Sequence, residues 1–504
     1  MEMDATSIVR RLSIPGVIAA TCVLVTLASE GTTRAQSFTF HELDFGGTQT
    51  VVQAIDDGRA AGWGTWPPNV GGDNETEVHA FTWTEAGGIV DIGTLGGTRA
   101  QAVAVDGDRV VGFSRLPGDT VSHAFSWTPT EGMRDLGTLG GTRSSASGVS
   151  GDEVVGSSTI ASGEFHAFRW TPAGGMEDLG TLEDGVESGA TEVDEGLVAG
   201  NSTIGNERRP VAWTAAGNII DLVADVDLPV FGLSRDVSDG VVVGNYGTSE
   251  DPQRAFAWTA TGGRIDLPIP DDFDSSLGTA TSEGQVVGSL FGDFGGLFGA
   301  EARPFSWTRE GGLIELGTLG GIAQATHVNA GKVLGLFHKD PDRDPDTDFG
   351  NVRTFLWTED DGLVDVTPAG FFGARPAGID AGGRIALHED KDFAEGASTR
   401  SAVLVPGPPD GDGDGIPDPD DDCPDSDRAP TLVIGGCDTG VPNSLLPGGC
   451  TIADRIGECA ASAATHGRFV KCVARILKEL KRARLITGPQ AKSVYRCAVK
   501  ARIP

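Results

Sequence analysis

The chain has 504 residues, with 72 Asp and Glu against 38 Lys and Arg, which gives a formal net charge of −34. This acidity argues against a nucleic-acid-binding protein, because contacts to phosphate groups need a basic surface. An apolar content of 39% is enough for a sizeable core, and 74 glycines indicate a structure rich in turns rather than in helices.

The first 35 residues have the features of a secretory signal peptide. Arg10 and Arg11 precede an apolar run at residues 14–28, and small residues follow at positions 33 and 35. The run is shorter than the roughly 20 residues that a membrane-spanning helix needs. We therefore predict cleavage after Ala35 and secretion to the extracellular space or the cell surface, with an uncleaved anchor as the alternative.

Residues 36–405 form a repeat that tryptophans mark at intervals of 43 to 50 residues. These tryptophans are Trp83, Trp127, Trp170, Trp213, Trp258, Trp307 and Trp357. Each lies in a short phrase typical of a strand, and the phrases that begin at His79, His123 and His166 read His-Ala-Phe-x-Trp. A fixed period of this length indicates a fold built from repeated units.

One unit, residues 101–139, divides into short strands. We predict strands at residues 102–105, 109–114, 123–128 and 133–139, with a tight hairpin turn at residues 106–108. Four short strands in each period are the signature of a propeller blade. Because one four-stranded sheet cannot bury both of its faces, the blades must pack against one another, with Trp and Phe between them.

The tight turns predict eight units along the chain. The first unit is preceded by residues 38–45, which match a fourth strand, and the repeat ends at residues 401–405, which match a third strand. Pairing these two segments would close the ring and leave no free sheet edge. The predicted fold is therefore mainly β, an eight-bladed β-propeller, with seven blades or an open β-solenoid as alternatives.

The repeated phrases carry a family resemblance. His-Ala-Phe-x-Trp-Thr, followed by Gly-Gly-x-x-Asp-Leu-Gly-Thr-Leu-Gly-Gly-Thr, resembles the HAF repeat of bacterial extracellular proteins. The match includes Asp91 and residues 93–98, recurs at residues 135–142, and weakens at residues 210–213, where His and Phe are both lost. The resemblance implies secretion and a repeat architecture, and it implies no activity and no catalytic residues.

The repeated side chains are expected to be structural. Arginines replace the histidines in the later copies, and arginine does not bind metal ions, so we favour structural hydrogen bonding over a ring of metal ligands. For the tryptophans we favour packing over a sugar-stacking role. No unit departs from the repeat with an obvious nucleophile, base or metal set.

Length variation in the repeat is concentrated in the loops at residues 65–78, 289–301 and 338–351. If the propeller has a ligand site, we expect it on these loops, because binding residues usually lie on loops over a rigid scaffold. The last loop carries alternate Asp residues between positions 340 and 348, which indicates either a weak Ca²⁺ site or a solvated acidic loop.

Residues 406–430 form an acidic linker rich in Pro and Gly, and part of it predicts a calcium site. Its spacing is D-x-D-x-D-G-x-x-D-x-x-D, and carboxylates at alternate positions of a tight loop can converge on one Ca²⁺ ion. The predicted metal ligands are Asp410, Asp412, Asp414, Ile416 (through its carbonyl), Asp418 and Asp421. The segment resembles a thrombospondin type 3 repeat, which implies Ca²⁺ as cofactor, and a disordered acidic linker is the alternative.

Residues 431–504 predict a small, basic helical domain held by disulfides. Six cysteines lie between Cys423 and Cys497, an even number that predicts three disulfides in an exported chain, with fifteen possible pairings. A zinc site is the alternative, but no C-x-x-C spacing supports it. Helices are predicted at residues 451–463, 468–485 and 489–501. Their basic face could dock on the acidic propeller, bind an anionic cell surface, or be solvated.

These features lead us to expect a secreted, non-enzymatic binding protein whose propeller recognises an extracellular polysaccharide or a protein partner. One alternative is a secreted propeller hydrolase or lyase that acts on polysaccharide, since one fold hosts many functions. Another is a structural protein anchored at the cell surface through its basic tail. No nucleic-acid partner and no transmembrane segment are expected.

Overall fold

The computed structural model describes residues 21–23, 38–65, 77–227, 229–292, 301–338, 352–371, 373–389, 399–408, 421–424, 426–427, 429–446 and 448–501. It divides into two compact units, one of which contains Thr39–Val405 and the other Pro406–Pro504. The predicted signal peptide lies outside the described residues except for β1 (Thr21–Val23). In the described part of the chain, no helix combines the length and apolar character needed to cross a membrane.

The first unit is built from antiparallel four-stranded sheets that follow one another along the chain. Three of them stand alone, with strand orders β3-β4-β5-β6, β23-β24-β25-β26 and β27-β28-β29-β30. Their bounds are β3 (Thr50–Asp56), β4 (Arg59–Thr65), β5 (Val78–Thr84), β6 (Gly88–Gly93), β23 (Ser275–Ser282), β24 (Gln285–Gly292), β25 (Glu301–Thr308), β26 (Gly312–Glu315), β27 (Ala323–Asn329), β28 (Lys332–His338), β29 (Val352–Thr358) and β30 (Gly362–Asp365).

The remaining sheets of the repeat join in pairs through short parallel contacts, Arg143 with Ser122 and Arg208 with Phe231. The first pair contains β7 (Ala100–Asp106), β8 (Arg109–Arg115), β9 (Ser122–Thr128), β10 (Gly132–Asp135), β11 (Gly140–Ser150), β12 (Glu153–Ile160), β13 (Phe165–Thr171) and β14 (Gly175–Gly180). The second contains β15 (Glu187–Asp194), β16 (Leu197–Ile204), β17 (Glu207–Trp213), β18 (Ile219–Asp221), β19 (Val230–Ser238), β20 (Val241–Thr248), β21 (Arg254–Thr259) and β22 (Gly263–Asp266).

The last sheet combines the two ends of the repeat. Its order is β1-β2-β33-β32-β31, so that β2 (Phe38–Leu43) lies beside β33 (Ser401–Pro406), followed by β32 (Ile385–Glu389) and β31 (Ala374–Ile379). The predicted pairing of the opening and closing segments is therefore confirmed. Because a strand from one end completes a sheet from the other, neither end leaves that edge unpaired.

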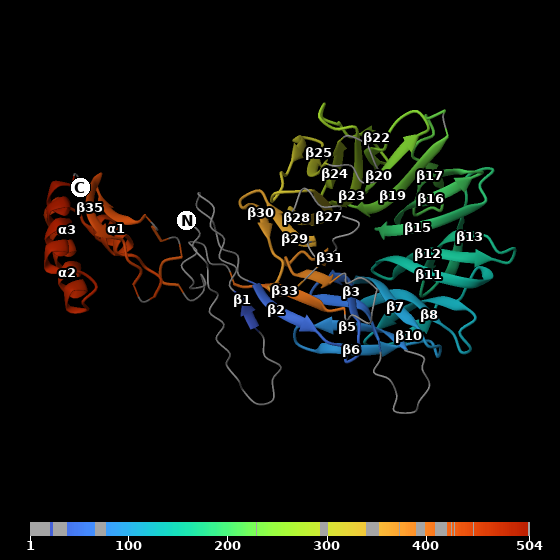
Figure 1. Cartoon of the computed structure of the whole chain (residues 1–504), viewed down its shortest axis with the longest axis horizontal. Coiled ribbons are helices and arrows are strands. Elements are labelled where there is room, and N and C mark those ends of the chain that lie inside the picture. Colours follow the sequence, from blue (N-terminus) through green and yellow to red (C-terminus); the bar gives the residue numbers. More distant parts are fainter. Residues whose placement is uncertain are drawn as a thin grey trace. The chain divides into compact units, whose positions relative to one another are not determined.

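The first strands of successive sheets form a closed ring. β3, β7, β11, β15, β19, β23 and β27 each pack against the first strand of the following sheet, and β31 packs against β3. Figure 1 shows these strands around a common centre, with the fourth strands at the periphery. This arrangement is a β-propeller, which confirms the predicted mainly β fold and its radial packing.

Tight turns between the first and second strands explain the strand boundaries. Asp57 and Gly58 adopt φ values of 42° and 76°, and Asp239 and Gly240 adopt 52° and 73°. Gly reaches this left-handed region without steric cost, and Asp tolerates it, which is why such pairs recur at these turns. The four strands predicted for residues 101–139 are all present as β7 to β10.

Phenylalanine rings fill the space between neighbouring sheets. Phe81, Phe125, Phe168, Phe256, Phe305 and Phe355 are fully buried. In the fourth repeat, where valine replaces this phenylalanine, the ring of Trp213 occupies the space above Gly200, and a methyl group on Gly200 would lie 2.7 Å from it. Trp213 is fully buried and donates a hydrogen bond from Nε1 to the carbonyl of Leu179 at 2.8 Å. The predicted packing role of the aromatic repeat residues is thus visible in the structure.

The second unit is a hairpin packed on helices. The hairpin has β34 (Thr431–Ile434) and β35 (Cys437–Pro442), and the helices are α1 (Ile452–Ser462), α2 (His466–Arg482) and α3 (Gly488–Lys500). Thr451, Thr465 and Thr487 cap the three N-termini, each accepting a hydrogen bond from a backbone N–H of the first turn. The helices were predicted within a few residues, whereas the hairpin was not.

Three disulfides hold this unit, Cys423–Cys450, Cys437–Cys497 and Cys459–Cys472. The predicted number is confirmed, and the pairing is now defined. Only Cys459–Cys472 joins two helices; Cys437–Cys497 joins the hairpin to α3. The core between hairpin and helices contains Leu432, Ile434, Val441, Ile456, Phe469, Val473, Leu477 and Val494, all buried.

Candidate active site

Of the predicted calcium ligands, only Asp421 belongs to the described residues. Asp410, Asp412, Asp414, Ile416 and Asp418 lie outside them, as do most of the three long propeller loops. Asp421 accepts a hydrogen bond at Oδ1 from the backbone N–H of Cys423 at 2.7 Å, while its Oδ2 is buried and has no hydrogen-bond partner among the described residues. A buried carboxylate oxygen without a donor fits the chemistry of a cation ligand.

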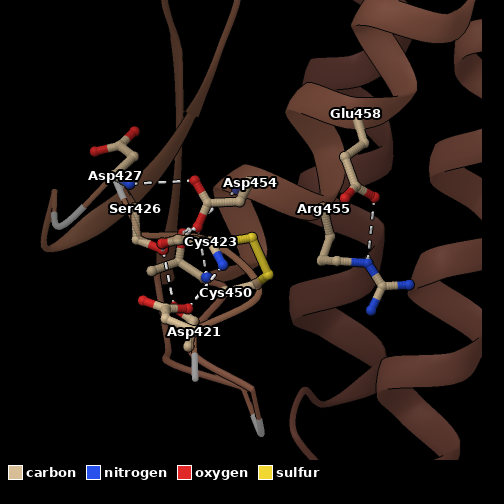
Figure 2. Close-up of a disulfide and its surroundings, with 10 residues drawn as sticks. Asp421, Cys423, Ser426, Asp427, Cys450, Asp454, Arg455 and Glu458 are labelled. Atoms are coloured by element: carbon tan, nitrogen blue, oxygen red, sulfur yellow. Dashed lines mark hydrogen bonds and ion pairs between the residues drawn. A yellow bond between two sulfur atoms is a disulfide. The ribbon is translucent and has the colours of Figure 1, made fainter. Parts of the chain in front are cut away.

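A disulfide and a carboxylate network hold the backbone beside Asp421 (Figure 2). Cys423 is bonded to Cys450, and Ser426 donates a hydrogen bond from Oγ to Asp454 Oδ2 at 2.7 Å. Asp454 also accepts from the N–H and the hydroxyl of Thr451, both at 2.6 Å. These bonds to Thr451 and Ser426 outweigh the effect of burial and keep the pKa of Asp454 below its ordinary value.

The repeated histidines form hydrogen bonds with aspartates of their own sheets. The Nδ1 atoms of His79, His123 and His166 lie 3.0, 2.8 and 2.9 Å from carboxylate oxygens of Asp91, Asp135 and Asp178. Where arginine replaces histidine, the pairing continues, as between Arg209 and Asp221 and between Arg353 and Asp365. Each pair joins a third strand to the fourth strand of the same sheet, which supports the structural role expected for these histidines.

Three titratable side chains share one equivalent position of the first strands, and none of them was among the predicted site residues. Glu192 is on β15, Asp236 on β19 and His327 on β27. The equivalent positions of the other first strands carry only small residues: Ala54, Ala104, Gly148, Ala280 and Gly378. Glu192, Asp236 and His327 each directly follow the extra residue of a β-bulge in the first strand. Such a bulge changes the direction in which the neighbouring side chain points.

Backbone amides hold the two carboxyl groups in place. Glu192 Oε1 accepts from the N–H of Val193 at 3.1 Å, and its side chain extends over Gly148 on β11, where a side chain would collide with it. Asp236 accepts from the N–H of Val237 and from the N–H of Thr281 on β23, both at 2.8 Å. The two groups therefore bridge between neighbouring sheets close to the propeller axis.

The surroundings push the pKa values of these groups apart. Burial, followed by repulsion from Asp236, raises the pKa of Glu192 to about 8. Burial raises the pKa of Asp236 to about 6, and burial lowers the pKa of His327 to about 4. Each side chain retains some solvent-accessible surface but is surrounded by protein atoms, and it is this enclosure that disfavours the charged forms. Near pH 7, Glu192 is protonated, Asp236 is mostly ionised and His327 is neutral.

A signal for these residues was present in the sequence. Aligning the units on their tight turns places Glu192, Asp236 and His327 in one column that otherwise contains Ala and Gly. The expectation that no unit departs from the repeat with an obvious nucleophile, base or metal set did not take these three residues into account. Each of the three residues lies inside a strand expected to be only structural, whereas ligand-binding residues were expected on the loops.

Comparison with known proteins finds similar solved structures at low sequence identity. No protein-family model and no curated protein matches the chain. The β-propeller domain of the Trilobed protease from Pyrococcus furiosus matches with a TM-score of 0.39 at 10% identity, over 64% of this chain and 98% of that domain. A prolyl endopeptidase matches with a TM-score of 0.44 at 11% identity, over 69% of this chain, and puromycin hydrolase with 0.40 at 11%, also over 69%. The chain spans only 55% and 60% of the latter two.

At 10–11% identity this likeness shows the fold alone. It nevertheless corrects the leading functional expectation, because the propellers that match belong to a protease, a prolyl endopeptidase and a hydrolase. The prediction of a secreted, non-enzymatic binding protein is therefore wrong as the main interpretation. The resemblances to HAF and thrombospondin type 3 repeats stay predictions.

Proposed function

We propose that the chain is a propeller hydrolase that uses Glu192 and Asp236 as its acid–base pair. The observation that supports this most is the placement of two carboxyl groups on adjacent first strands, where five other units carry Ala or Gly. Hydrolysis by a carboxyl pair needs one protonated group to donate to the leaving group and one ionised group to act as base or nucleophile. With pKa values of about 8 and about 6, Glu192 suits the first role and Asp236 the second.

The substrate class that we propose is polysaccharide. Cleavage of a glycosidic bond is one reaction for which two carboxyl groups in different protonation states suffice without a further nucleophile or metal. The backbone amides of Val193, Val237 and Thr281 fix the carboxyl orientations by hydrogen bonding. His327, neutral near pH 7, contributes a third polar group on the same ring of strands.

The test is the release of reducing ends from a panel of neutral and acidic polysaccharides by the full-length chain. We expect turnover with a bell-shaped pH dependence whose limbs lie near pH 6 and pH 8. E192Q and D236N should each lower kcat by about 100-fold or more, while E187Q and D272N, which change exposed carboxyl groups of the same unit, should not. Turnover that is unchanged in both E192Q and D236N, or no turnover of any polysaccharide by the wild-type chain, would refute the proposal.

We also propose eight blades, the count that the tight turns predict. The closed order of first strands from β3 to β31 and the pairing of β2 with β33 support it. Electron-microscopic class averages viewed along the axis would count the blades directly. A seven-fold average would overturn this number.

We propose in addition that the chain is exported and that its linker binds Ca²⁺. Three disulfides support an oxidising compartment, and the unpartnered Oδ2 of Asp421 supports a cation at residues 410–421. Asp410, Asp412, Asp414, Asp418, Asp421 and the carbonyl of Ile416 would hold the ion, which would neutralise their mutual repulsion. Calorimetric titration of the full chain with Ca²⁺ should give saturable binding that D421N weakens, and a flat titration would refute it. N-terminal sequencing of the exported chain tests cleavage after Ala35.

A further inference from the structure

The basic unit contains an open groove between α2 and α3. Its volume is about 560 Å³, within the range of small-molecule sites. Its lining residues are Ala474, Leu477, Lys478, Lys481, Arg482, Gly488, Ala491, Lys492 and Tyr495. Four of them are cationic and none is acidic.

The cations of the groove have no acidic partner within the described part of the chain. Lys478, Lys481, Arg482 and Lys492 are exposed, and the acid nearest to them in sequence, Glu479, pairs with Arg455 instead. Lys478, Lys481 and Arg482 are spaced by three and four residues, so they lie on one face of α2. Lys492 stands on α3, which places positive charge on both walls.

The floor and one wall of the groove are apolar and aromatic. Leu477 and Ala491 are buried, whereas Tyr495 keeps 43% of its surface exposed. An exposed tyrosine ring offers a flat face with a polar tip, which suits a ring that is apolar on its faces and polar at its rim. The first turn of α3, at Gly488, adds the positive end of a helix dipole.

We propose that this groove binds an anionic polysaccharide, one whose sugar units carry sulfate or carboxylate groups. Charges on both walls match a ligand with several anionic groups rather than a single small anion. The tyrosine and the apolar floor match sugar faces, which a lipid headgroup at a flat membrane surface would not bring into the groove. The proposal concerns the tail alone and does not depend on the catalytic role of Glu192 and Asp236.

The charge of the whole chain makes the test selective. Because the chain carries a formal charge of −34, its overall field repels a polyanion, so any binding must come from a local basic site. The probes are dextran sulfate and neutral dextran, with the full-length chain measured by calorimetry at low and high salt. We expect binding of dextran sulfate only, weakened by salt because the charges are exposed.

Two double variants separate the groove from diffuse charge. K481A/R482A removes one Lys and one Arg from the groove, and R468A/K471A removes one of each from the same helix outside it. If each groove cation contributes as a basic residue does at an anionic surface, K481A/R482A should bind about 30-fold more weakly. R468A/K471A should bind less than about threefold more weakly, and Y495L should lose affinity with no change of charge.

The outcomes decide the proposal. Equal losses of affinity in the two double variants would show that binding depends on the overall charge of the helix and not on the groove, and they would overturn the proposal. An absence of dextran sulfate binding by the wild-type chain would also overturn it. Tighter binding to vesicles of phosphatidylcholine and phosphatidylserine than to dextran sulfate would overturn the polysaccharide assignment. Circular dichroism of each variant shows whether the helices persist. Y495L leaves the net charge unchanged, so a loss of affinity in this variant reports on the tyrosine ring rather than on charge.

Discussion

Asp380 accepts a hydrogen bond at Oδ2 from the backbone N–H of Gly58 at 2.9 Å, although the two residues are 322 positions apart. Gly58 forms the first tight turn of the repeat, and Asp380 directly follows β31, the first strand of the last sheet. The same bond joins Asp56 to Gly107 at 2.9 Å. Asp380 and Gly58 therefore close the ring with a contact that neighbouring units use elsewhere.

Removing this closing carboxylate should destabilise the propeller. Asp380 is fully buried and also accepts from the N–H of Arg384 at 2.8 Å and from its guanidinium at 3.0 Å. D380A leaves those donors unsatisfied, so we expect a loss of about 2 kcal/mol or more in unfolding free energy. Urea denaturation measures it, with D272A as an exposed control. A change below about 0.5 kcal/mol, typical of surface substitutions, would contradict the closing role.

Glu192 should make the stability of the propeller depend on pH. Its folded-state pKa of about 8 lies above its ordinary value of 4.5, so the folded chain binds this proton more tightly than the unfolded chain. The contribution is present in full below about pH 4.5 and is lost as the pH rises through 8. E192Q, which mimics the protonated group, should therefore gain stability relative to wild type between pH 5 and pH 8.5.

Thermal unfolding of both chains across this range tests the prediction. Asp236 and Asp106 are the charged groups that raise the pKa of Glu192 by repulsion, and D236N should lower it. His327 also lowers the stability of the folded chain on acidification, because its pKa in the folded state is depressed to about 4. This effect is the same in wild type and E192Q, so it cancels in the stability difference between them. E187Q, on the same strand but exposed, should show no such trend. If the stability difference between E192Q and wild type did not change with pH, this would be evidence against the enclosed position of Glu192.

Trp213 should matter more to stability than the other repeat tryptophans. It is fully buried and fills the place of the missing phenylalanine above Gly200, whereas Trp127 is only partly buried. W213A should lose about 3–5 kcal/mol of unfolding free energy, as F168A should, while W127A should lose clearly less. Urea denaturation of the three variants compares them. Equal costs for W213A and W127A would show that Trp213 has not taken over the phenylalanine role.

The disulfides should differ in their contribution to the helical unit. Cys437–Cys497 spans 60 residues and Cys459–Cys472 spans 13. The chain-entropy model assigns about 4 kcal/mol to the longer loop and about 3 kcal/mol to the shorter one. C437S/C497S should therefore accelerate hydrogen exchange in α2 and α3 more than C459S/C472S does. The opposite order would mean that the link between α1 and α2 dominates, independently of loop length.

Much of the architecture was determined by the sequence itself. The spacing of tryptophans and the Asp-Gly turns predicted four-stranded units and the pairing of β2 with β33, because hydrophobic period and turn chemistry are local properties. The helices of the tail and the number of disulfides followed equally from local pattern and cysteine count. The hairpin of β34 and β35 was missed, since its short strands lie in a Gly- and Pro-rich segment.

Only the tertiary structure decided how the ionisable groups of the first strands are enclosed. Glu192, Asp236 and His327 are separated by 44 and 91 residues in the chain, and each is unremarkable in its own strand. Their pKa shifts arise from enclosure by neighbouring sheets, and the groove of Lys481 and Lys492 arises from the packing of two helices. Desolvation and charge proximity depend on distances in space, which a one-dimensional pattern encodes only through the finished fold.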